Sequence, residues 1–296
     1  MEYENIFEKA CLIQISSSIW QCSKVLNQSI LEEKFGSNNE WLKGRKYLIN
    51  PELLGPINTT THQARNTVQK FALPFPITSI YLVPKDSISM IDNQLQQFKE
   101  RFWNKVDDFV AIYDVAREEA ENVLGELFDE TEYPTDVKSK FNFEWRFLVL
   151  SVPGKSAILS PEIYEREKEK FQNLMDETRE IAMIALREEF ADVLTNLTDK
   201  LNGNGNGKVL NGSMFNKLNA FLSEFNSKNI FHDDKLKELI KHAKSVISGV
   251  SGYNLKYNET LKNTIKNEMD MLKQSVEAAI EDMPRRKLRI AMTANE

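Results

Sequence analysis

Apolar residues recur with a helical period through a proline-free stretch that runs from Ser87 to Tyr133. A neighbouring row of apolar positions is interrupted by Lys105 and Glu119. The pattern predicts one long amphipathic helix, and a seven-residue repeat within it favours coiled-coil-like packing. That repeat consists of Ile88, Leu95, Phe102, Phe109, Ala116 and Val123, and the neighbouring row contains Ile91, Phe98 and Ile112.

A second long amphipathic helix is predicted from residue 161 onward. Ser160 can cap its first turn, and Pro161 suits the first helical position, where a missing N–H costs nothing. The apolar spacing is close to the roughly 3.6 residues of a helical turn, which predicts a straight helix. We expect the two long helices to pack as an antiparallel pair. The apolar face of the second consists of Phe171, Leu174, Thr178, Ile181, Ala185, Phe190, Val193, Leu197 and Leu201.

Shorter segments complete a mainly α fold with a small β component. A short helix is predicted over residues 23–36, where Gly36 would end it, and the connection at 41–57 is punctuated by proline and glycine. Strands are predicted where β-branched and aromatic residues are dense, at residues 11–20, 77–83 and 143–151. Three C-terminal helices are predicted at 213–226, 233–248 and 255–282.

A run rich in Gly and Asn at residues 203–212 is the clearest break in the chain. Its composition is typical of a flexible linker. It separates residues 1–202, a mixed N-terminal part with the long helical hairpin, from residues 213–296. This C-terminal helical segment is expected to pack on the hairpin.

The composition indicates a folded protein that does not coat nucleic acid by bulk charge. Of 296 residues, 41% are apolar, and the formal net charge is −6. The two cysteines, Cys11 and Cys22, are expected to be reduced thiols. The N-terminal stretch is acidic where a signal peptide is basic, and no apolar run approaches the roughly 18 residues of a membrane span. We therefore expect a cytoplasmic protein of a prokaryotic cell or phage-infected host, with no membrane contact.

Two segments resemble nucleotide-binding loops without meeting their requirements. Gly154-Lys155-Ser156 follows a predicted strand, but a phosphate-binding loop needs glycine where Val149 stands, and Pro153 removes an N–H from the cradle. We interpret this segment as a strand that ends in a Pro-Gly turn. The glycines at 203, 205 and 207 follow a predicted helix and lack dinucleotide spacing, so a surface linker is favoured.

No set of side chains in the sequence predicts a metal, cofactor or catalytic site. The histidines His62, His232 and His242 lack the Cys or His neighbours of a zinc site, and His232 precedes a predicted helix N-terminus that acidic residues suit. Cys22 is expected to be a buried structural thiol. We therefore expect a non-enzymatic protein. An enzyme whose site is assembled from distant residues would leave no motif, and a deep pocket with convergent polar groups would favour it.

Two short basic clusters are the candidate contact sites. Basic residues with aromatic neighbours can bind single-stranded nucleic acid, and they can equally contact a partner protein. The second cluster can also complement the C-terminal dipole of the preceding helix. The first cluster comprises Trp41, Lys43, Arg45 and Lys46 with Tyr47, and the second comprises Arg285, Arg286, Lys287 and Arg289.

The order of features resembles DUF3150, an uncharacterised prokaryotic and phage family. The resemblance rests on CLIQISSSIWQCSKVL, WLKGRKYLINPELLGPI, ALPFPITSIYLVPKDSI, FKERFWNKVDDFVAIYDVA and FNFEWRFLVLSVP. It implies a context in which such genes often lie beside a MoxR-like AAA+ ATPase and a von Willebrand A-type protein. It implies no catalytic residue.

Together these observations predict a helical interaction or scaffold protein. It would be an accessory subunit or client of an AAA+ ATPase and von Willebrand A assembly, or a phage or mobile-element accessory factor. It can also form a homo-oligomer in this prediction. A nucleic-acid-associated protein that uses the two basic clusters is the alternative, and it predicts binding that falls steeply with salt.

Overall fold

A computed structural model describes residues 6–35, 41–150, 159–202 and 212–283. Within these ranges the fold is mainly helical with a small antiparallel β component, as the sequence predicted. The chain forms two compact units. The first comprises Met1–Leu12, Phe71–Ser87 and Leu148–Glu296, and the second comprises Ile13–Lys70 and Ile88–Phe147. In this division the chain up to Leu12 and the 71–87 segment group with the C-terminal helices, whereas the sequence predicted a linear division with a linker at residues 203–212.

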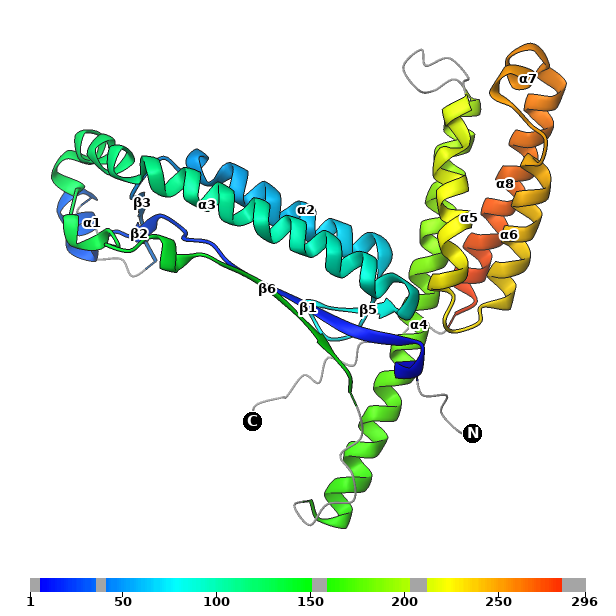
Figure 1. Cartoon of the computed structure of the whole chain (residues 1–296), viewed down its shortest axis with the longest axis horizontal. Helices are drawn as coiled ribbons and strands as arrows, with labels where there is room; N and C mark the ends of the chain where they lie inside the picture. Colours follow the sequence, from blue (N-terminus) through cyan, green and yellow to red (C-terminus); the bar gives the residue numbers. More distant parts are fainter. Residues whose placement is uncertain (1–5, 36–40, 151–158, 203–211, 284–296) are drawn as a thin grey trace. The chain divides into compact units, whose positions relative to one another are not determined.

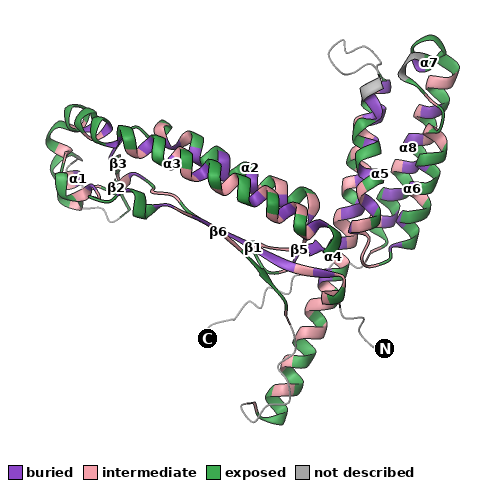
Figure 2. Cartoon of the chain, viewed as in Figure 1, coloured by how far each residue is buried: buried purple, intermediate pink, exposed green. Residues whose placement is uncertain are grey.

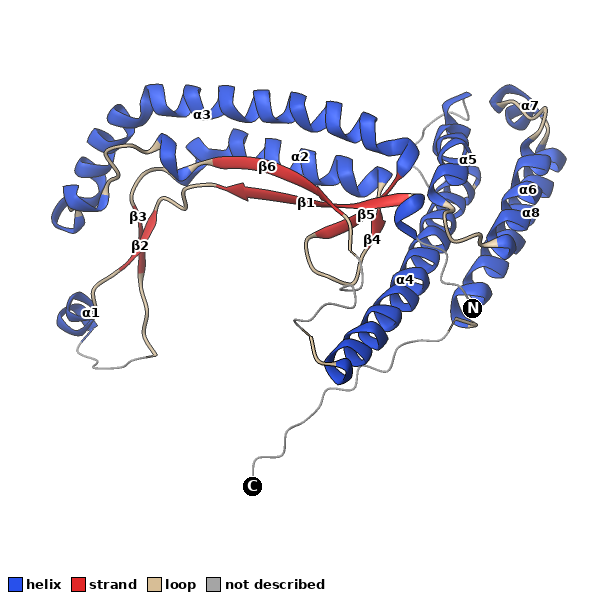
Figure 3. Ribbon diagram, turned by 60° about the horizontal axis from the view of Figure 1, so that its bottom comes forward, coloured by secondary structure: helices blue, strands red, loops and turns tan. Residues whose placement is uncertain are grey.

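Two antiparallel helices and two strands form the body of the second unit. Helix α2 (Gly55–Phe71) and helix α3 (Ile88–Leu124) run side by side along β1 (Ala10–Ser18) and β6 (Asn142–Leu148) (Figures 1 and 3). Aromatic rings fill the space between them. The rings of Phe102 and Phe143 lie 5.4 Å apart, and both side chains are fully buried. The remaining elements are β2 (Ser23–Val25), α1 (Gln28–Phe35) and β3 (Arg45–Tyr47).

The buried face of α3 keeps most of the predicted seven-residue row but not the predicted second row. Leu95, Phe102, Phe109 and Ala116 of the predicted row are buried, whereas Val123 at its end is 78% exposed. In the second row Ile91 is buried but Ile112 is 43% exposed, and the buried neighbours of the first row are Val106, Tyr113 and Ala120, each four residues after one of its members. The buried residues are Ile91, Leu95, Phe102, Val106, Phe109, Tyr113, Ala116 and Ala120.

The first unit is a helical bundle built around the second long helix, α4 (Pro161–Leu201). Ser160 caps it as predicted, with its hydroxyl accepting from Ile163 N. The sequence pattern predicted that α4 would pair with α3. In the structure α4 packs on α8 and α5 of its own unit, and α3 belongs to the other unit (Figure 1). The bundle helices are α5 (Asn216–Lys228), α6 (Asp234–Ile247), α7 (Gly252–Tyr257) and α8 (Glu259–Glu281).

A buried ion pair joins three helices of this bundle. Arg187 on α4 donates to both carboxylate oxygens of Asp233, at 2.8 and 3.0 Å, and to the Ala279 carbonyl of α8. Asp233 also caps α6, because its carboxylate accepts from Leu236 N at 3.0 Å. The predicted helix start at His232-Asp233 is thereby confirmed. Arg187 and Asp233 are 5% and 2% exposed, so both charges depend on each other.

The strands form a sheet in the order β4-β5-β1-β6, and β2 and β3 form a separate two-stranded ribbon. The strands predicted at 77–83 and 143–151 correspond to β5 and β6, which are not neighbours, since β1 stands between them in the order. None of the described helices is both long enough and apolar enough to span a membrane. The small strands of the first unit are β4 (Leu73–Pro74) and β5 (Ile80–Pro84).

Candidate interaction surface

The first basic cluster lies on the two-stranded ribbon of the second unit. The strands are antiparallel, and Arg45 stands opposite Val25 while Tyr47 stands opposite Ser23. Because side chains alternate along a strand, Arg45, Tyr47 and Val25 share one face of the ribbon. Val25 and Tyr47 are 61% and 56% exposed, and Arg45 is exposed as well. This face therefore presents a cation and an aromatic ring together.

Backbone hydrogen bonds hold both ends of the ribbon. Leu48 N donates to the Cys22 carbonyl at 2.7 Å, and Leu26 N donates to the Gly44 carbonyl at 3.0 Å. At Gly44 a Cβ would lie only 2.8 Å from a methyl carbon of Leu26. A larger residue there would have to displace the Leu26 side chain, so glycine suits this close approach.

The opposite face of the ribbon is anchored inside the unit. Lys46 points there, with its side chain 10% exposed, and forms an ion pair with Glu132 at 2.6 Å. Its ammonium also donates to the Leu127 carbonyl. Tyr133 donates its hydroxyl to the Leu48 carbonyl at 2.6 Å, and burial raises the pKa of Tyr133 to about 12. Of the predicted cluster, Lys46 is thus engaged within the protein.

The rest of the predicted cluster is exposed beside the ribbon. Trp41 is 93% exposed, and Lys43 is exposed two residues before the start of β3. Strand β2 adds two exposed residues that the sequence pattern did not single out: Val25 stands opposite Arg45 on the same face, and Lys24 stands opposite Lys46 on the other face. The "ribbon surface" is defined here as Lys24, Val25, Trp41, Lys43, Arg45 and Tyr47. The second predicted cluster, Arg285, Arg286, Lys287 and Arg289, lies outside the described residues.

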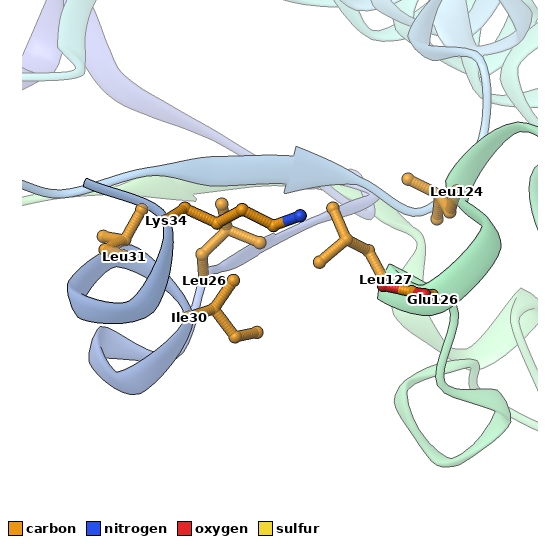
Figure 4. Close-up of a pocket in the computed structure, with 7 residues that line it drawn as sticks. All are labelled: Leu26, Ile30, Leu31, Lys34, Leu124, Glu126 and Leu127. Atoms are coloured by element: carbon orange, nitrogen blue, oxygen red, sulfur yellow. The ribbon is translucent and has the colours of Figure 1, made fainter. Parts of the chain in front are cut away.

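An apolar pocket of about 400 Å³ opens beside the ribbon surface. Figure 4 shows leucine and isoleucine side chains from α1 facing those that follow the end of α3, with the Lys34 ammonium reaching between them. Among the described residues that line it, Lys34 and Glu126 are charged. The pocket can accept an apolar side chain, and its described lining does not include the convergent polar groups that catalysis requires. The apolar lining consists of Leu26, Ile30, Leu31, Leu124 and Leu127.

The remaining chemistry-bearing residues are dispersed. A second hollow of about 740 Å³ lies in the first unit between α6 and α8, and its lining includes His242 and Asp282. Cys22 is 2% exposed, and burial raises the pKa of its thiol, which disfavours the nucleophilic thiolate. His232 Nε2 lies 3.1 Å from the Lys9 ammonium, and His62 lies on α2.

The described residues bear on the predicted absence of a metal site but not on the two loop motifs. Among the described residues, no group of three or more His, Cys, Asp or Glu side chains is arranged to hold a metal ion. The Gly154-Lys155-Ser156 segment and the glycines at 203, 205 and 207 lie outside the described residues.

Comparison with known proteins connects the chain to one family. Residues 7–250 match the model of DUF3150, described as a protein of unknown function. The match includes the ribbon surface and α4, and it ends before α7. No curated protein matches the chain, and no solved structure matches it.

Proposed function

The chain belongs to the DUF3150 family, whose description assigns no function, and we propose that it is a non-enzymatic interaction protein that binds a partner through the ribbon surface. The observation that carries this proposal is the exposure of Arg45 and Tyr47 on one ribbon face, with Trp41 nearby. Tryptophan, tyrosine and arginine dominate the energetically important positions of protein interfaces.

Rigid anchoring of the ribbon supports this role. Lys46 and the Tyr133 hydrogen bond fix the inner face, so the exposed side chains are presented on an ordered backbone. A pre-ordered surface loses less conformational entropy on binding than a loose loop would. The adjacent apolar pocket can receive one apolar side chain of the partner.

For the partner we propose an AAA+ ATPase or a von Willebrand A-type protein, with this chain as an accessory subunit or client. In the family that the sequence resembles, the genes often lie beside genes for these two kinds of protein, and this supports the choice. Exposed Lys24, Lys43 and Arg45 favour an acidic patch on that partner, because complementary charge speeds association and sets orientation.

Affinity capture from the native host tests the proposal. The full chain and an Arg45→Ala/Tyr47→Ala variant are compared at low and high salt, followed by mass spectrometry and nucleic-acid staining. An Ile112→Ala/Val115→Ala variant is the matched control, since it removes exposed side chains of α3 elsewhere on the unit. We expect the ribbon variant to lose the partner and the control to retain it. Recovery of the same amount of partner protein with both variants would contradict the proposal.

A second candidate function is contact with single-stranded nucleic acid. It is favoured by the exposure of Lys24, Lys43 and Arg45 around one ribbon that also presents Tyr47. Three phosphate contacts predict a slope of about −2 for log K against log salt, since each contact contributes roughly −0.7 on single strands. Fluorescence anisotropy with a labelled oligonucleotide measures this slope. Lack of binding at low salt would dismiss the candidate.

A further inference from the structure

The first part of α4 has an apolar face that the bundle does not bury. The buried residues of this helix begin at Thr178, and none lies within residues 161–177 (Figure 2). At about 100° per residue, Tyr164, Phe171 and Met175 lie on the same side as Thr178. All three are half-buried, and only Met175 borders the bundle core. The core-facing stripe of α4 thus continues beyond the helices that cover it.

A single helical segment of this kind needs a partner. Most helical stability in proteins comes from packing of an apolar face, and the described helices of the bundle bury no residue of α4 before Thr178. The ion pairs within this segment, Lys168–Glu165 and Lys170–Glu167, are exposed. Such pairs contribute only about 0.2–0.5 kcal/mol each.

The course of α8 places its C-terminal end beside the middle of α4. Helix α7, just before α8, contacts the 3-10 turn Gly212–Phe215 that also contacts α4, so α8 begins near the end of α4. Near its own end, α8 receives the hydrogen bond from Arg187 to Ala279. The two helices are therefore antiparallel, and the end of α8 lies beside the middle of α4 (Figure 1).

Residues 284–296 match this face in length, charge and apolar content. Thirteen extended residues reach about 43 Å, which exceeds the roughly 39 Å of helix between residues 161 and 187. Residues 161–180 contain seven acidic and four basic residues, a net charge of −3, whereas 284–296 contain four basic and one acidic, a net charge of +3. Leu288, Ile290 and Met292 supply apolar side chains among the basic ones.

We propose that residues 284–296 dock in the same chain on the face of α4 formed by Tyr164, Phe171, Leu174 and Met175. The apolar side chains of the segment cover this face, and its arginines and lysine lie against the acidic residues of 161–180. The second basic cluster then makes intramolecular contacts with α4 and is not accessible to nucleic acid. This inference concerns the first unit and does not depend on the proposed role of the ribbon surface.

Hydrogen exchange tests the docking. Amide exchange is measured by mass spectrometry in the full chain and in a chain that ends at Met283. We expect exchange in 161–177 to become at least about tenfold faster on truncation, because this part loses its cover, while 185–201 stays unchanged and reports that the bundle is intact. Equal exchange of 161–177 in both chains would overturn the proposal. Protection that fades on dilution of the full chain would also overturn it, since a second copy would then be the occupant.

Zero-length carbodiimide coupling gives a second, positional test. Lys287 carries the only primary amine of residues 284–296, so a docked segment should couple it to a carboxylate of 161–180. Lys287→Arg is the matched control, because it keeps the charge and removes the amine. We expect peptides that are cross-linked through residue 287 to residues 161–180 from the natural chain, and no such peptides from the control. Coupling of Lys287 only to residues outside 161–180 would place the segment elsewhere and overturn the proposal.

Discussion

Arg45 on the ribbon and Arg187 in the bundle are both arginines beside aromatic or apolar neighbours, yet the structure uses them in opposite ways. Arg45 is exposed on the surface of the two-stranded ribbon. Arg187 is 5% exposed and joins α4, the start of α6 and α8 through Asp233 and the Ala279 carbonyl. A basic residue therefore indicates a binding surface only where no group of the same chain already pairs with its charge.

The same contrast occurs within the ribbon itself. Lys46 and Arg45 are adjacent in sequence, but strand alternation sends them to opposite faces. Lys46 is held by Glu132 and the Leu127 carbonyl, whereas Arg45 stands opposite the exposed Val25. Substitutions on the two faces should therefore separate stability from binding.

The largest effect is expected at Arg187. An Arg187→Met substitution leaves the Asp233 carboxylate buried without its partner, which should lower the free energy of unfolding by about 3–5 kcal/mol. Denaturant unfolding measures this loss. In an Arg187→Met/Asp233→Asn variant the charge is gone while the asparagine can still cap α6, so a large part of the stability should return. A loss below about 1 kcal/mol in the single variant would contradict the assigned role.

An intermediate effect is expected at Lys46. Lys46→Met removes the charge-assisted hydrogen bond to the Leu127 carbonyl and the ion pair with Glu132 in a mostly buried setting, and it should cost about 1.5–3 kcal/mol. Arg45→Met, the matched control on the exposed face, should change stability by less than about 0.5 kcal/mol. Both values come from the same unfolding experiment. If the two substitutions cost the same, the division of the ribbon into an inner and an outer face is wrong.

The smallest effect at neutral pH is expected at Tyr133. Tyr133→Phe removes the hydrogen bond to the Leu48 carbonyl and should cost about 1 kcal/mol. Because burial raises the folded pKa to about 12, above the usual value of about 10, the folded state retains the phenolic proton longer than the unfolded chain does. The stabilising contribution is therefore complete below pH 10 and declines between pH 10 and 12.

Comparison of unfolding curves through this alkaline range checks the prediction. The natural chain should lose more stability between pH 10 and 12 than Tyr133→Phe does. Parallel curves would show that Tyr133 titrates normally.

Much of the fold could be predicted because long helices carry their own pattern. The long helices α3 and α4, the cap at Ser160 and the helix start at Asp233 follow from local sequence. The second apolar row of α3 was misassigned because residues three or four positions from the first row are both its neighbours on the helix surface. Burial of Val106 and exposure of Ile112 show that the row four positions after it is the buried one.

The candidate surface was predicted only in part. Residues 23–36 were expected to be one helix, but Ser23–Val25 form β2, and α1 begins only at Gln28. Strands of three residues are too short to show an alternating pattern, and β2 exists because β3 pairs with it. For that reason the sequence could select Arg45 but not its neighbours Lys24 and Val25.

The sequence by itself determined the mainly helical class, the two long helices and the residues that can supply charge and aromatic contact. These features depend on periodicity and side-chain chemistry, which are local. Only the tertiary structure decided that α4 packs on α8 and α5, that Lys46 is engaged while Arg45 is exposed, and that Arg187 is buried against Asp233. Each of these outcomes joins residues distant in the chain, and many such pairings satisfy the same local pattern equally well.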